Sequence, residues 1–460
     1  MSQNNNDNKT LINDFTEGNV TGRLIKFATP LFLGNMLQVV YNMVDMMIVG
    51  NVIGKAGLSA VSIGGDLNNF LTFIAMGFTN AGTIIISQYI GAGQKRNVGR
   101  FIGTFTLALT AAAVIMTVIS AALHENILRW MNTPDEAYTE AKAYCLTCIL
   151  GLVFIYGYNA VSGVLRGMGD SRHPFIFIAV AAAMNIALDC LFVIGFGTGA
   201  FGAALATVIS QGFSFIAAVV FLAKNRHRLG FEMDRECFRI DRGMLATLIK
   251  LGVPMALKST SVAFSKMFVN SYINSFGVTV SAVAGVGSKL NHMIAQCSNA
   301  FNTAGASMVG QNIGAEKYDR VPKILISDFL IMAVISAICS AAVIMYPETV
   351  FGLFTKDPEV LKVSMEFIPV AVVIFIGSAF RAPSNALSNG TGNFVINFAI
   401  AILDAIVVRI GLALFLGLYM NMGYLGFWFG DAFAGFTPFV VGGIFYLSGK
   451  WKTNKYVIKK

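Results

Sequence analysis

The sequence predicts an all-α polytopic membrane protein, with 12 transmembrane helices arranged as two six-helix parallel repeats around a central cavity. The first supporting observation is composition: of 460 residues, 55% are hydrophobic and only 12% are charged, whereas a soluble domain carries about 25% charged residues. The second is a series of apolar stretches of about 20 residues, the length that crosses a bilayer as a helix. The third is a set of short motifs that recur in the second half of the chain.

Twelve apolar segments can be marked as predicted membrane spans, six on each side of a polar connection near the midpoint of the chain. The second and eighth segments are longer than one crossing needs, so we expect them to be tilted or to extend beyond the bilayer. The predicted spans are 24–50, 57–89, 99–123, 138–165, 173–197, 200–223, 245–275, 279–312, 322–346, 360–387, 394–418 and 423–448.

Lysine and arginine are concentrated in alternate loops. The loops after the second, fourth, sixth and eighth spans and the end of the chain are rich in them, and the loops between are poor in them. By the positive-inside rule both termini lie in the cytoplasm, which agrees with an even number of spans. These loops account for the net charge of +9, so it does not indicate a nucleic-acid partner. The first apolar segment is too long for a signal peptide and is predicted to stay as a span.

The expected organisation follows from the spans and the loop charges. The only long polar connection falls at the midpoint and is interpreted as the linker between two lobes. The protein is expected in the plasma (cytoplasmic) membrane, in contact with the lipid bilayer. The predicted parts are a cytoplasmic N-terminal tail (1–23), an N-lobe (24–223), a cytoplasmic linker (224–244), a C-lobe (245–448) and a basic cytoplasmic tail (449–460).

The two halves are internal repeats. Four motifs recur in the same order, each shifted by 223 or 224 residues, and four colinear matches at one offset are hard to obtain by chance. With six spans per half, both halves enter the membrane from the same side, so an axis along the membrane normal relates them and a cavity near the midplane is expected between them. Such a duplicated unit suits transport by alternating access. The matching segments are 24–30 with 248–254, 88–92 with 311–315, 166–170 with 389–393, and 199–202 with 423–426.

The first span carries a polar stripe. Asn35, Gln38, Asn42 and Asp45 follow the spacing i, i+3, i+7, i+10, which places them on one face of an otherwise apolar helix. Polar groups at membrane depth face other protein groups or a water-filled cavity. Pro30 precedes the stripe on the same span, and a proline inside a helix removes a backbone hydrogen bond and can bend the helix there.

Further polar residues of the first half have helical spacing. Asn185 and Asp189 are four residues apart on the fifth span, Ala203 and Thr207 four apart on the sixth, and Asn159 lies on the fourth. Oxygen ligands of this kind suit a hard cation such as Na⁺, and the same carboxylates can instead bind a proton, because burial and mutual repulsion favour the protonated acid. The residues of this predicted cation or proton site are Asp45, Asp189, Asn185, Asn159, Thr207 and Ala203.

The competing interpretation is that these groups only bond helices together, as asparagine and threonine often do in membranes. A bond that the fold requires should recur in both halves, whereas a coupling site need not. The second half carries no acid at the corresponding offset, which favours function for the two aspartates. The residue 224 positions after Asp45 is Val269, and those 223 and 224 positions after Asp189 are Leu412 and Ala413.

The second half carries a basic excess inside its spans. Asp404 can pair with Arg409 or, across helices, with Lys266. We expect internal pairing rather than contact with a solute, although the excess keeps an anionic or zwitterionic substrate open. The intramembrane basic residues are Lys258, Lys266, Lys289, Arg381 and Arg409.

Methionine and phenylalanine on the first two spans, including Met46 and Phe73, have two interpretations. Ordinary packing is favoured, and the alternative is an adaptable apolar wall for varied hydrophobic solutes. With Asn35, Gln38 and Asn42 they form the predicted cavity or substrate residues.

Neither an enzyme nor a cofactor is predicted. No nucleophile, base and orienting group recur at useful spacing, and no zinc-type spacing is present. Cys145 and Cys148 have the spacing of a redox motif but lack its βαβ context, so they are interpreted as small apolar residues on one helix. No metal is expected apart from a coupling Na⁺.

The run 17–50 resembles the start of the multidrug and toxic compound extrusion (MATE) family. It includes Glu17-Gly18-Asn19, the segment 24–30 that ends in proline, and Tyr41-Asn42-Met43-Val44-Asp45. The 12 spans, the proline that begins both halves and the glycine-rich end of the fourth span add to a resemblance that covers essentially the whole chain.

The resemblance implies an N-lobe and a C-lobe with a central cleft, from which drugs leave as H⁺ or Na⁺ enters. Members with an N-lobe cation site have an aspartate on span 1, an asparagine four residues before an aspartate on span 5, a threonine on span 6 and an asparagine on span 4. The residues that match are Asp45, Asn185, Asp189, Thr207 and Asn159, with the backbone carbonyl of Ala203 added.

Bending of span 1 at its proline, here Pro30, is proposed in the family to couple protonation to drug release, and Pro254 holds the equivalent place in the second half. Members with a C-lobe cation site have acids on spans 7 and 10. This chain instead has Lys258, Lys266 and Arg381 there, which favours the N-lobe site and puts cationic-drug specificity in doubt.

The predicted function is secondary active export of small organic, drug-like solutes in exchange for inward H⁺ or Na⁺, by a protein that acts as a monomer. A lipid-linked precursor flippase or a polysaccharide exporter of related fold is the alternative. A membrane receptor or scaffold without transport is a more distant one.

Overall fold

A computed structural model describes residues 11–231, 237 and 239–453 of the chain. Within these residues the secondary structure is helical and contains no strand. Parts of the predicted N-terminal tail (1–10), linker (232–236 and 238) and C-terminal tail (454–460) lie outside the described residues. The predicted all-α class is therefore confirmed for the described chain, and the tail and linker assignments stay predictions.

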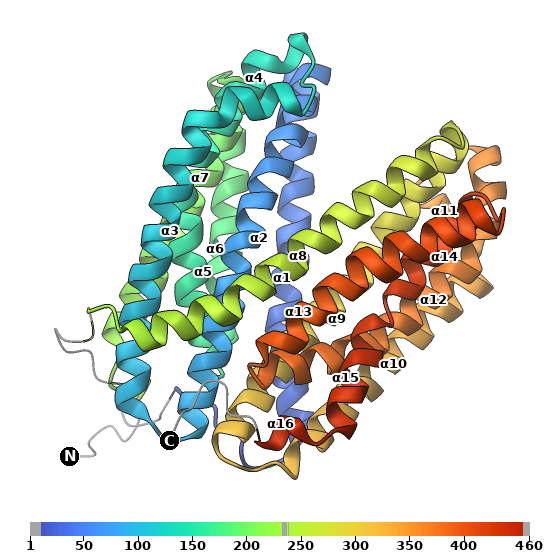
Figure 1. The fold of residues 1–460 in the computed structure, drawn as a ribbon. Helices are drawn as coiled ribbons and strands as arrows, with labels where there is room; N and C mark the ends of the chain where they lie inside the picture. Colours follow the sequence, from blue (N-terminus) through green and yellow to red (C-terminus); the bar gives the residue numbers. More distant parts are fainter. Residues whose placement is uncertain (1–10, 232–236, 238, 454–460) are drawn as a thin grey trace, which may run out of the picture. The chain divides into compact units, whose positions relative to one another are not determined.

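Each of the six predicted spans of the first half coincides with a helix or with a pair of consecutive helices (Figure 1). The fourth span is broken at Gly151, where its two helices meet at a bend of 44°. The fifth span ends in a π-helical segment directly after Asp189. The helices are α1 (Val20–Ile53), α2 (Lys55–Gly91), α3 (Lys95–Trp130), α4 (Asp135–Leu150), α5 (Leu152–Gly167), α6 (Arg172–Asp189), η1 (Cys190–Gly195) and α7 (Gly199–Lys224).

The second half repeats this pattern. Its fifth span again contains π-helical segments, and its last span is divided into two α-helices. The helices are α8 (Arg242–Asn274), α9 (Val278–Gly314), α10 (Arg320–Met345), α11 (Pro347–Gly352), α12 (Pro358–Gly390), α13 (Phe394–Ile402), η3 (Leu403–Leu412), η4 (Phe415–Tyr419), α14 (Tyr424–Ala434), α15 (Thr437–Leu447) and α16 (Lys450–Thr453).

Among the described residues, nine helical segments are long and apolar enough to cross a membrane, and the bent pair α4 and α5 makes a tenth. The other two predicted spans form α8 and α9, which have 33 and 37 residues but are less apolar. Lys258 and Lys266 of α8, and the glycines, serines and asparagines of α9, lower their hydropathy. Helices of this length and polarity at membrane depth need protein or water on their polar faces.

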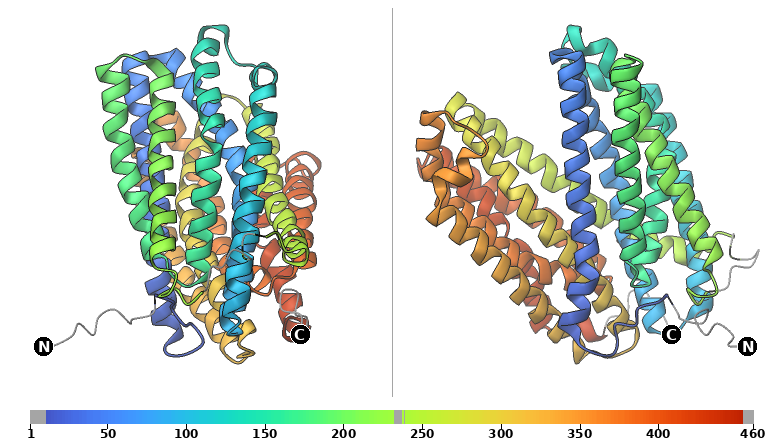
Figure 2. Two further views of the ribbon diagram at one scale, coloured as in Figure 1. Left: turned by 90° about the vertical axis from the view of Figure 1, so that its left-hand side faces the viewer. Right: turned by 180° about the vertical axis from the view of Figure 1, so that it is seen from behind.

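The helices form two compact units. Unit 1 contains residues 11–14 and Leu33–Gly252, and unit 2 contains Phe15–Phe32 and residues 253–453. In unit 1, α2 packs on α4 and α5, and α6 packs on α7 (Figure 2). In unit 2, α12 packs on α9 and α10.

Two helices cross between the units, and each carries a proline next to the crossing. α1 passes from unit 2 to unit 1 after Phe32 and contains Pro30; α8 passes from unit 1 to unit 2 after Gly252 and contains Pro254. Because proline lacks an amide hydrogen, each helix loses one backbone hydrogen bond close to the point where it changes unit.

Contacts at their N-terminal ends explain why α1 begins in unit 2 and α8 begins in unit 1. Phe15 donates its N–H to Gln311 Oε1 at 2.9 Å and accepts from Asn312 Nδ2 at 3.1 Å, which fixes the approach to α1 within unit 2. At the start of α8, Gly252 packs directly on the ring of Phe78 within unit 1.

Close helix contacts recur in the two units at glycine. A Cβ atom added to Gly167 would lie 2.8 Å from the carbonyl oxygen of Thr83, and one added to Gly390 would lie 2.7 Å from that of Ala306. All these residues follow the offset of 223. Only glycine permits so close an approach of two helices, so the repeated sequence motif encodes a repeated packing contact.

The turn after this contact also recurs. Gly169 has φ of 84° and Gly392 has φ of 69°, in the left-handed region that glycine adopts without strain. The next residue caps the following helix: Asp170 Oδ1 accepts two backbone N–H bonds in unit 1, and Asn393 Oδ1 accepts two in unit 2. Both side chains satisfy amides that a helix start leaves unpaired.

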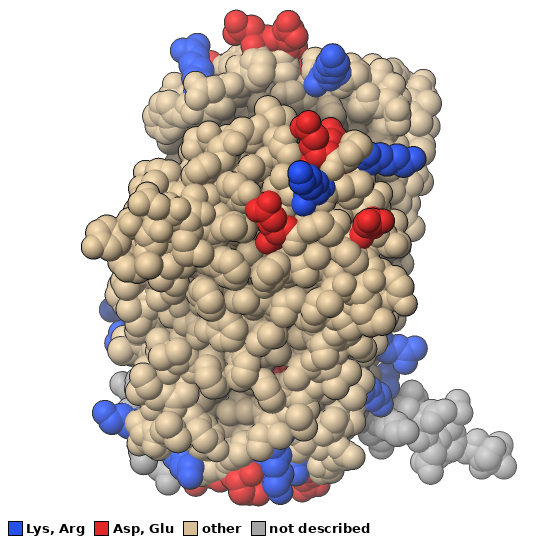
Figure 3. Space-filling model, turned by 90° about the vertical axis from the view of Figure 1, so that its right-hand side faces the viewer, with Lys and Arg blue, Asp and Glu red and all other residues tan. Residues whose placement is uncertain are grey.

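Charged side chains avoid the middle of the molecular face shown in Figure 3. Lysine, arginine, aspartate and glutamate gather toward its two ends, and the band between them consists of other residues. Large apolar side chains of the transmembrane helices are exposed, among them Ile338 at 64% and Ile344 at 56%. A belt of this kind suits lipid as the surrounding solvent.

Candidate functional site

Asp189 is the centre of the predicted site in unit 1. It is the last residue of α6, directly before the π-helical segment η1, and its exposed fraction is 0%. Both of its carboxylate oxygens are buried, and neither has a hydrogen-bond partner among the described residues. A buried carboxylate without a partner is costly as an anion, so this group requires a proton or a cation.

Asn185 lies one turn before Asp189 and is held by the neighbouring helix. Its Nδ2 donates to Thr207 Oγ1 of α7 at 3.4 Å, and its buried Oδ1 has no partner among the described residues. Ala203 lies one turn before Thr207 and is buried. The bond to Thr207 uses the donor side of the amide, which leaves its acceptor oxygen available beside the acid.

Asp45 supplies the second carboxylate, from the part of α1 that belongs to unit 1. It is 6% exposed, and its buried Oδ1 has no hydrogen-bond partner among the described residues. Asp45 lies close enough to Asp189 for their charges to repel each other. The structure therefore brings together the two aspartates that the sequence placed on different spans.

Among the predicted site residues, Asn159 has the least contact with the two aspartates. It is half-buried on α5, and its Nδ2 donates to the carbonyl oxygen of Ile155 in its own helix at 2.8 Å. No hydrogen bond to Asp45 or Asp189 is formed within the described chain. Its carbonyl oxygen is the atom that remains to serve the site.

Two tyrosine hydroxyls that the sequence analysis missed lie within electrostatic range of Asp45, and an amide that it missed contacts one of them. Tyr41 lies one turn before it and interacts with the side chains of Gln38 and Gln211, and Tyr144 of α4 also lies within electrostatic range of the carboxylate. The spacing of four residues between Tyr41 and Asp45 places both on one helix face and could have predicted this contact. Tyr144 and Gln211 lie on other helices, and no sequence pattern relates them to Asp45.

The predicted substrate residues are more exposed than the carboxylate site. Gln38 and Asn42 are exposed on α1 and Asn35 is half-buried. Met46 is 39% exposed and Phe73 is 36% exposed. These side chains therefore take little part in the interior packing of unit 1 and are accessible at its surface.

The interior of unit 2 holds a chain of ion pairs. Asp404 bonds Arg381 through one oxygen and Arg409 Nη2 through the other, the latter at 2.8 Å, and Arg409 Nη1 continues to Asp431. Asp404 is 0% exposed and the Arg409 side chain 2%. The expected internal pairing of Asp404 with Arg409 is confirmed, and Lys266 is not its partner.

Two lysines of α8 lie outside this chain of ion pairs. Lys258 Nζ donates to Asn385 Oδ1 at 2.6 Å, which satisfies a donor but leaves its charge uncompensated. Lys266 lies in the electrostatic range of Asp431 but forms no hydrogen bond or salt bridge with the described residues. The basic excess expected from the sequence thus remains in unit 2.

Asp328 of α10 is a buried acid that the sequence analysis missed, although it lies inside the predicted span 322–346. It is 0% exposed, and both carboxylate oxygens lack a partner among the described residues. A methyl group at Gly305 would lie 3.1 Å from Asp328 Oδ2, just as one at Gly82 would touch Phe105. Unit 2 therefore has an aspartate where the same packing contact of unit 1 has a phenylalanine.

The donor set of the unit 1 site fits a proton or a hard cation. It offers carboxylate, amide and hydroxyl oxygens, which suit Na⁺ rather than a transition metal. Within the described part of the chain, no group of three or more histidine, cysteine, aspartate or glutamate side chains could hold a metal ion.

Comparison with known proteins adds an independent view of the repeat. The MatE family model matches residues 30–191 and, a second time, residues 254–415. The two matches begin 224 residues apart, which reproduces the offset of the sequence motifs.

Several individual proteins are similar to the chain. The probable multidrug resistance protein YpnP of Bacillus subtilis is 33% identical over 67% of this chain and 68% of its own length. The crystal structure of a MATE protein in the straight conformation is 21% identical, covers 96% of this chain and 99% of that one, and has a TM-score of 0.88. A MOP superfamily transporter from Pyrococcus furiosus, in which reverse polarity of the binding pocket suggests a different function, is 20% identical, covers 97% and 98%, and has a TM-score of 0.86.

Proposed function

Because the chain belongs to the MatE family of multidrug efflux transporters, we propose that it exports drug-like organic solutes in exchange for inward H⁺ or Na⁺. The observation that carries this proposal is the pair of buried carboxylates in unit 1. Asp45 and Asp189 lie within range of mutual repulsion, and neither Asp189 oxygen nor Asp45 Oδ1 has a partner among the described residues.

The site binds the coupling cation because binding removes an electrostatic penalty. A charge at the bilayer centre costs at least about 2.5–3.5 kcal/mol, and two neighbouring carboxylates add their repulsion. One proton or one Na⁺ relieves both. The ligands for Na⁺ are the carboxylates of Asp45 and Asp189, Asn185 Oδ1, Thr207 Oγ1 and the carbonyl of Ala203, with Asn159 at the edge of the set.

Movement of the cation supplies the driving force. A single positive charge that moves inward down about 100 mV releases roughly 2.3 kcal/mol, before any concentration difference is counted. The inward movement of the cation drives the solute outward against its own gradient if the cation and the solute cannot be bound in the same conformation of the protein. Alternating access of the two units, with the cation site confined to unit 1, provides this exclusion.

α1 links the site to a change of conformation. Asp45 lies on the part of α1 in unit 1, whereas Pro30 lies beside the point where the helix enters unit 2. Cation binding at Asp45 therefore acts on a helix that already lacks one backbone hydrogen bond near its crossing. Pro254 serves the same bending role in α8.

Solute contacts begin at the accessible side chains of α1 and α2. Asn35, Gln38 and Asn42 provide hydrogen bonds, and Met46 and Phe73 provide an adaptable apolar surface. Relatives of the chain are named as multidrug resistance and multidrug export proteins, which favours drug-like cargo over the lipid-linked sugars of the alternative. The proposed setting is a monomer in the plasma membrane with both termini in the cytoplasm, without catalysis and without a nucleic-acid partner.

The test is solute flux in proteoliposomes, with a pH gradient and a Na⁺ gradient imposed separately and a cationic and an anionic dye as cargo. We expect one gradient to drive export, and the variants Asp45→Asn and Asp189→Asn to reduce the driven flux at least about tenfold. The matched control is Asp170→Asn, the same chemical change at a helix cap of unit 1 for which unit 2 already uses Asn393.

Wild-type flux in Asp45→Asn would overturn the coupling assignment. Gradient-driven flux lost equally in Asp170→Asn would show that the effect is general to the unit rather than to the site. Absence of dye flux under both gradients, together with movement of a lipid-linked sugar, would replace drug export by the flippase alternative.

A further inference from the structure

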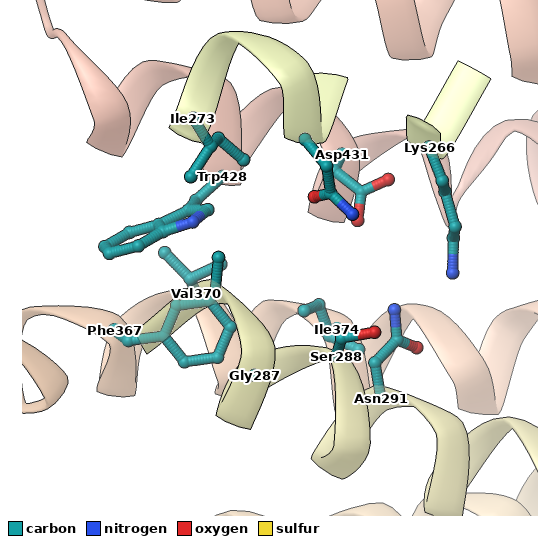
Figure 4. Close-up of a pocket in the computed structure, with 12 residues that line it drawn as sticks. Lys266, Ile273, Gly287, Ser288, Asn291, Phe367, Val370, Ile374, Trp428 and Asp431 are labelled. Atoms are coloured by element: carbon teal, nitrogen blue, oxygen red, sulfur yellow. The ribbon is translucent and has the colours of Figure 1, made fainter. Parts of the chain in front are cut away.

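Unit 2 contains a cavity that the coupling site does not use. Its volume is about 40 Å³, and it lies between α8, α9, α12 and α14. Figure 4 shows an apolar end formed by Ile273, Phe367, Val370 and Trp428. Polar side chains form the other end: Lys266, Asn270, Ser288, Asn291 and Asp431.

The cavity presents two hydrogen-bond donors without an acceptor. Trp428 is 3% exposed, and its buried Nε1–H has no partner among the described residues. Lys266, whose ammonium lies at the polar end (Figure 4), forms no hydrogen bond or salt bridge with that part of the chain. Of the two, only the Trp428 N–H is a buried donor, since Lys266 is half-buried. Buried donors of native proteins are normally paired, so the cavity lacks an acceptor for this N–H among the described residues.

The charged side chains around the cavity indicate whether the missing acceptor is neutral or anionic. Asp404 and Asp431 are bonded by Arg381 and Arg409, two acids by two guanidinium groups. Asp431 lines the cavity, but its Oδ1 is already bonded to Arg409. Lys266 is left as the uncompensated cation at the cavity wall, and a positive excess of this kind attracts an anion.

We propose that this cavity of unit 2 binds the carboxylate of an organic anion, with the Trp428 indole N–H as hydrogen-bond donor and Lys266 as the compensating positive charge. The inference rests on the proposed function and names the class of cargo. It assigns acidic organic solutes to a transporter whose coupling cation is proposed to bind in the other unit.

The dimensions decide which part of the solute enters. A water molecule needs about 10–15 Å³ of such space, so about 40 Å³ accommodates a carboxylate rather than a whole drug-like molecule. Asn270 and Ser288 at the polar end are exposed, which leaves the cavity open on that side for the rest of the solute. The cavity is thus an anchoring site for one group of a larger cargo.

The experiment compares two probes of equal shape and opposite charge, radiolabelled 1-naphthoate and 1-naphthylmethylammonium, by equilibrium dialysis against the purified full-length protein in detergent. We expect the wild type to bind naphthoate at least about tenfold more tightly than the ammonium probe. Lys266→Gln should weaken naphthoate binding about tenfold, Lys266→Arg should retain most of it, and Trp428→Phe should weaken it severalfold while keeping an aromatic wall.

The matched control is Lys258→Gln, which removes the other uncompensated lysine of the same helix without touching the cavity. Equal binding of both probes, or equal losses in Lys258→Gln and Lys266→Gln, would overturn the proposal. Retained naphthoate affinity in Lys266→Gln would overturn it as well, and a thermal unfolding midpoint close to that of the wild type shows that each variant is folded.

The outcome is separable from that of the proposed function. Naphthoate binding that depends on Lys266, without cation-driven flux, would uphold this site and refute the coupling. Cation-driven export of a cationic dye, without preferential naphthoate binding, would do the reverse.

Discussion

The two units share one fold but differ in how the acids of their fifth spans and of the neighbouring helices are paired. In unit 1, Asp45 and Asp189 have carboxylate oxygens without partners among the described residues. In unit 2, Asp404 and Asp431 are bonded by arginines. The fifth span of each half contains a π-helical segment with an aspartate at its start, Asp189 before η1 and Asp404 in η3. The same backbone feature thus presents an unpaired acid in one unit and a neutralised acid in the other.

The contrast separates what the fold requires from what function adds. Contacts that recur in both units, such as the glycine approaches and the helix caps, serve the architecture. The unpaired carboxylates of Asp45 and Asp189 in unit 1, and that of Asp328 and the lysines outside the ion pairs in unit 2, do not recur. A buried polar group that occurs in only one repeat lowers stability and is not required by the shared fold. It is therefore a stronger candidate for a functional role than a contact that recurs in both units.

The largest expected effect comes from breaking the ion-pair chain of unit 2. Arg409→Met should lower the free energy of unfolding by about 3–5 kcal/mol, because the buried Asp404 would lose one of its two partners and the half-buried Asp431 its salt-bridge partner. The measurement is the thermal unfolding midpoint of the purified protein in detergent.

The corresponding change in unit 1 sharpens the comparison. Asp189→Asn removes an acid that has no partner among the described residues, so the unfolding midpoint should stay the same or rise. The double variant Arg409→Met with Asp431→Asn should recover part of the loss, because Asp404 keeps Arg381 as its partner and the Asp431 charge is removed. An Arg409→Met protein as stable as the wild type would contradict the view that unit 2 depends on charge neutralisation.

An intermediate effect is expected at the recurring glycine contacts. Gly167→Ala and Gly390→Ala each place a methyl group within 3 Å of backbone atoms of the facing helix, and the resulting overpacking should cost about 1–3 kcal/mol. Similar losses in the two variants would confirm that the contact serves both units alike.

The control for the glycine pair is Gly443→Ala in α15, where an added Cβ meets no atom within 4 Å. Alanine favours a helix over glycine by about 1 kcal/mol, so this variant should be as stable as the wild type or slightly more stable. A loss at Gly443 equal to that at Gly390 would mean that flexibility rather than close packing is what the glycines provide.

The smallest expected effect is an exchange of caps between the units. Asn393→Asp should change the free energy of unfolding by no more than a few tenths of a kcal/mol, because both residue types cap a helix start well. Asp170→Asn should cost slightly more, because Asp170 Oδ2 also pairs with His173 Nδ1. Alanine at either position should cost about 1 kcal/mol. A large loss in one exchange alone, measured by the same unfolding assay, would show that the two caps are not equivalent.

Much of the fold could be predicted because its signals are local. The predicted span 24–50 lies inside α1 (Val20–Ile53), and 279–312 lies inside α9 (Val278–Gly314). The helices extend a few residues beyond the apolar segments because helical hydrogen bonding continues past the point where hydropathy falls. The 44° break at Gly151 carried no proline and was not predicted.

The site was partly predictable for the same reason. The spacing of Asn185 and Asp189 fixes them on one face of one helix, whereas the bond from Asn185 to Thr207 depends on how α6 packs on α7. Asp328 was overlooked inside an apolar span although its position was visible. Trp428 and Lys266 lie more than 150 residues apart, and nothing in the sequence linked them.

The sequence by itself determined the 12 spans, the duplication and the acids of the first half, because hydropathy, motif recurrence and helical spacing act over short distances along the chain. The tertiary structure alone decided which arginine neutralises which aspartate, where α1 and α8 pass from one unit to the other, and that Lys266 shares a cavity with Trp428. Those outcomes depend on the packing of helices that are distant in sequence, and contacts of only a few ångströms between such helices leave no periodic signal in the chain.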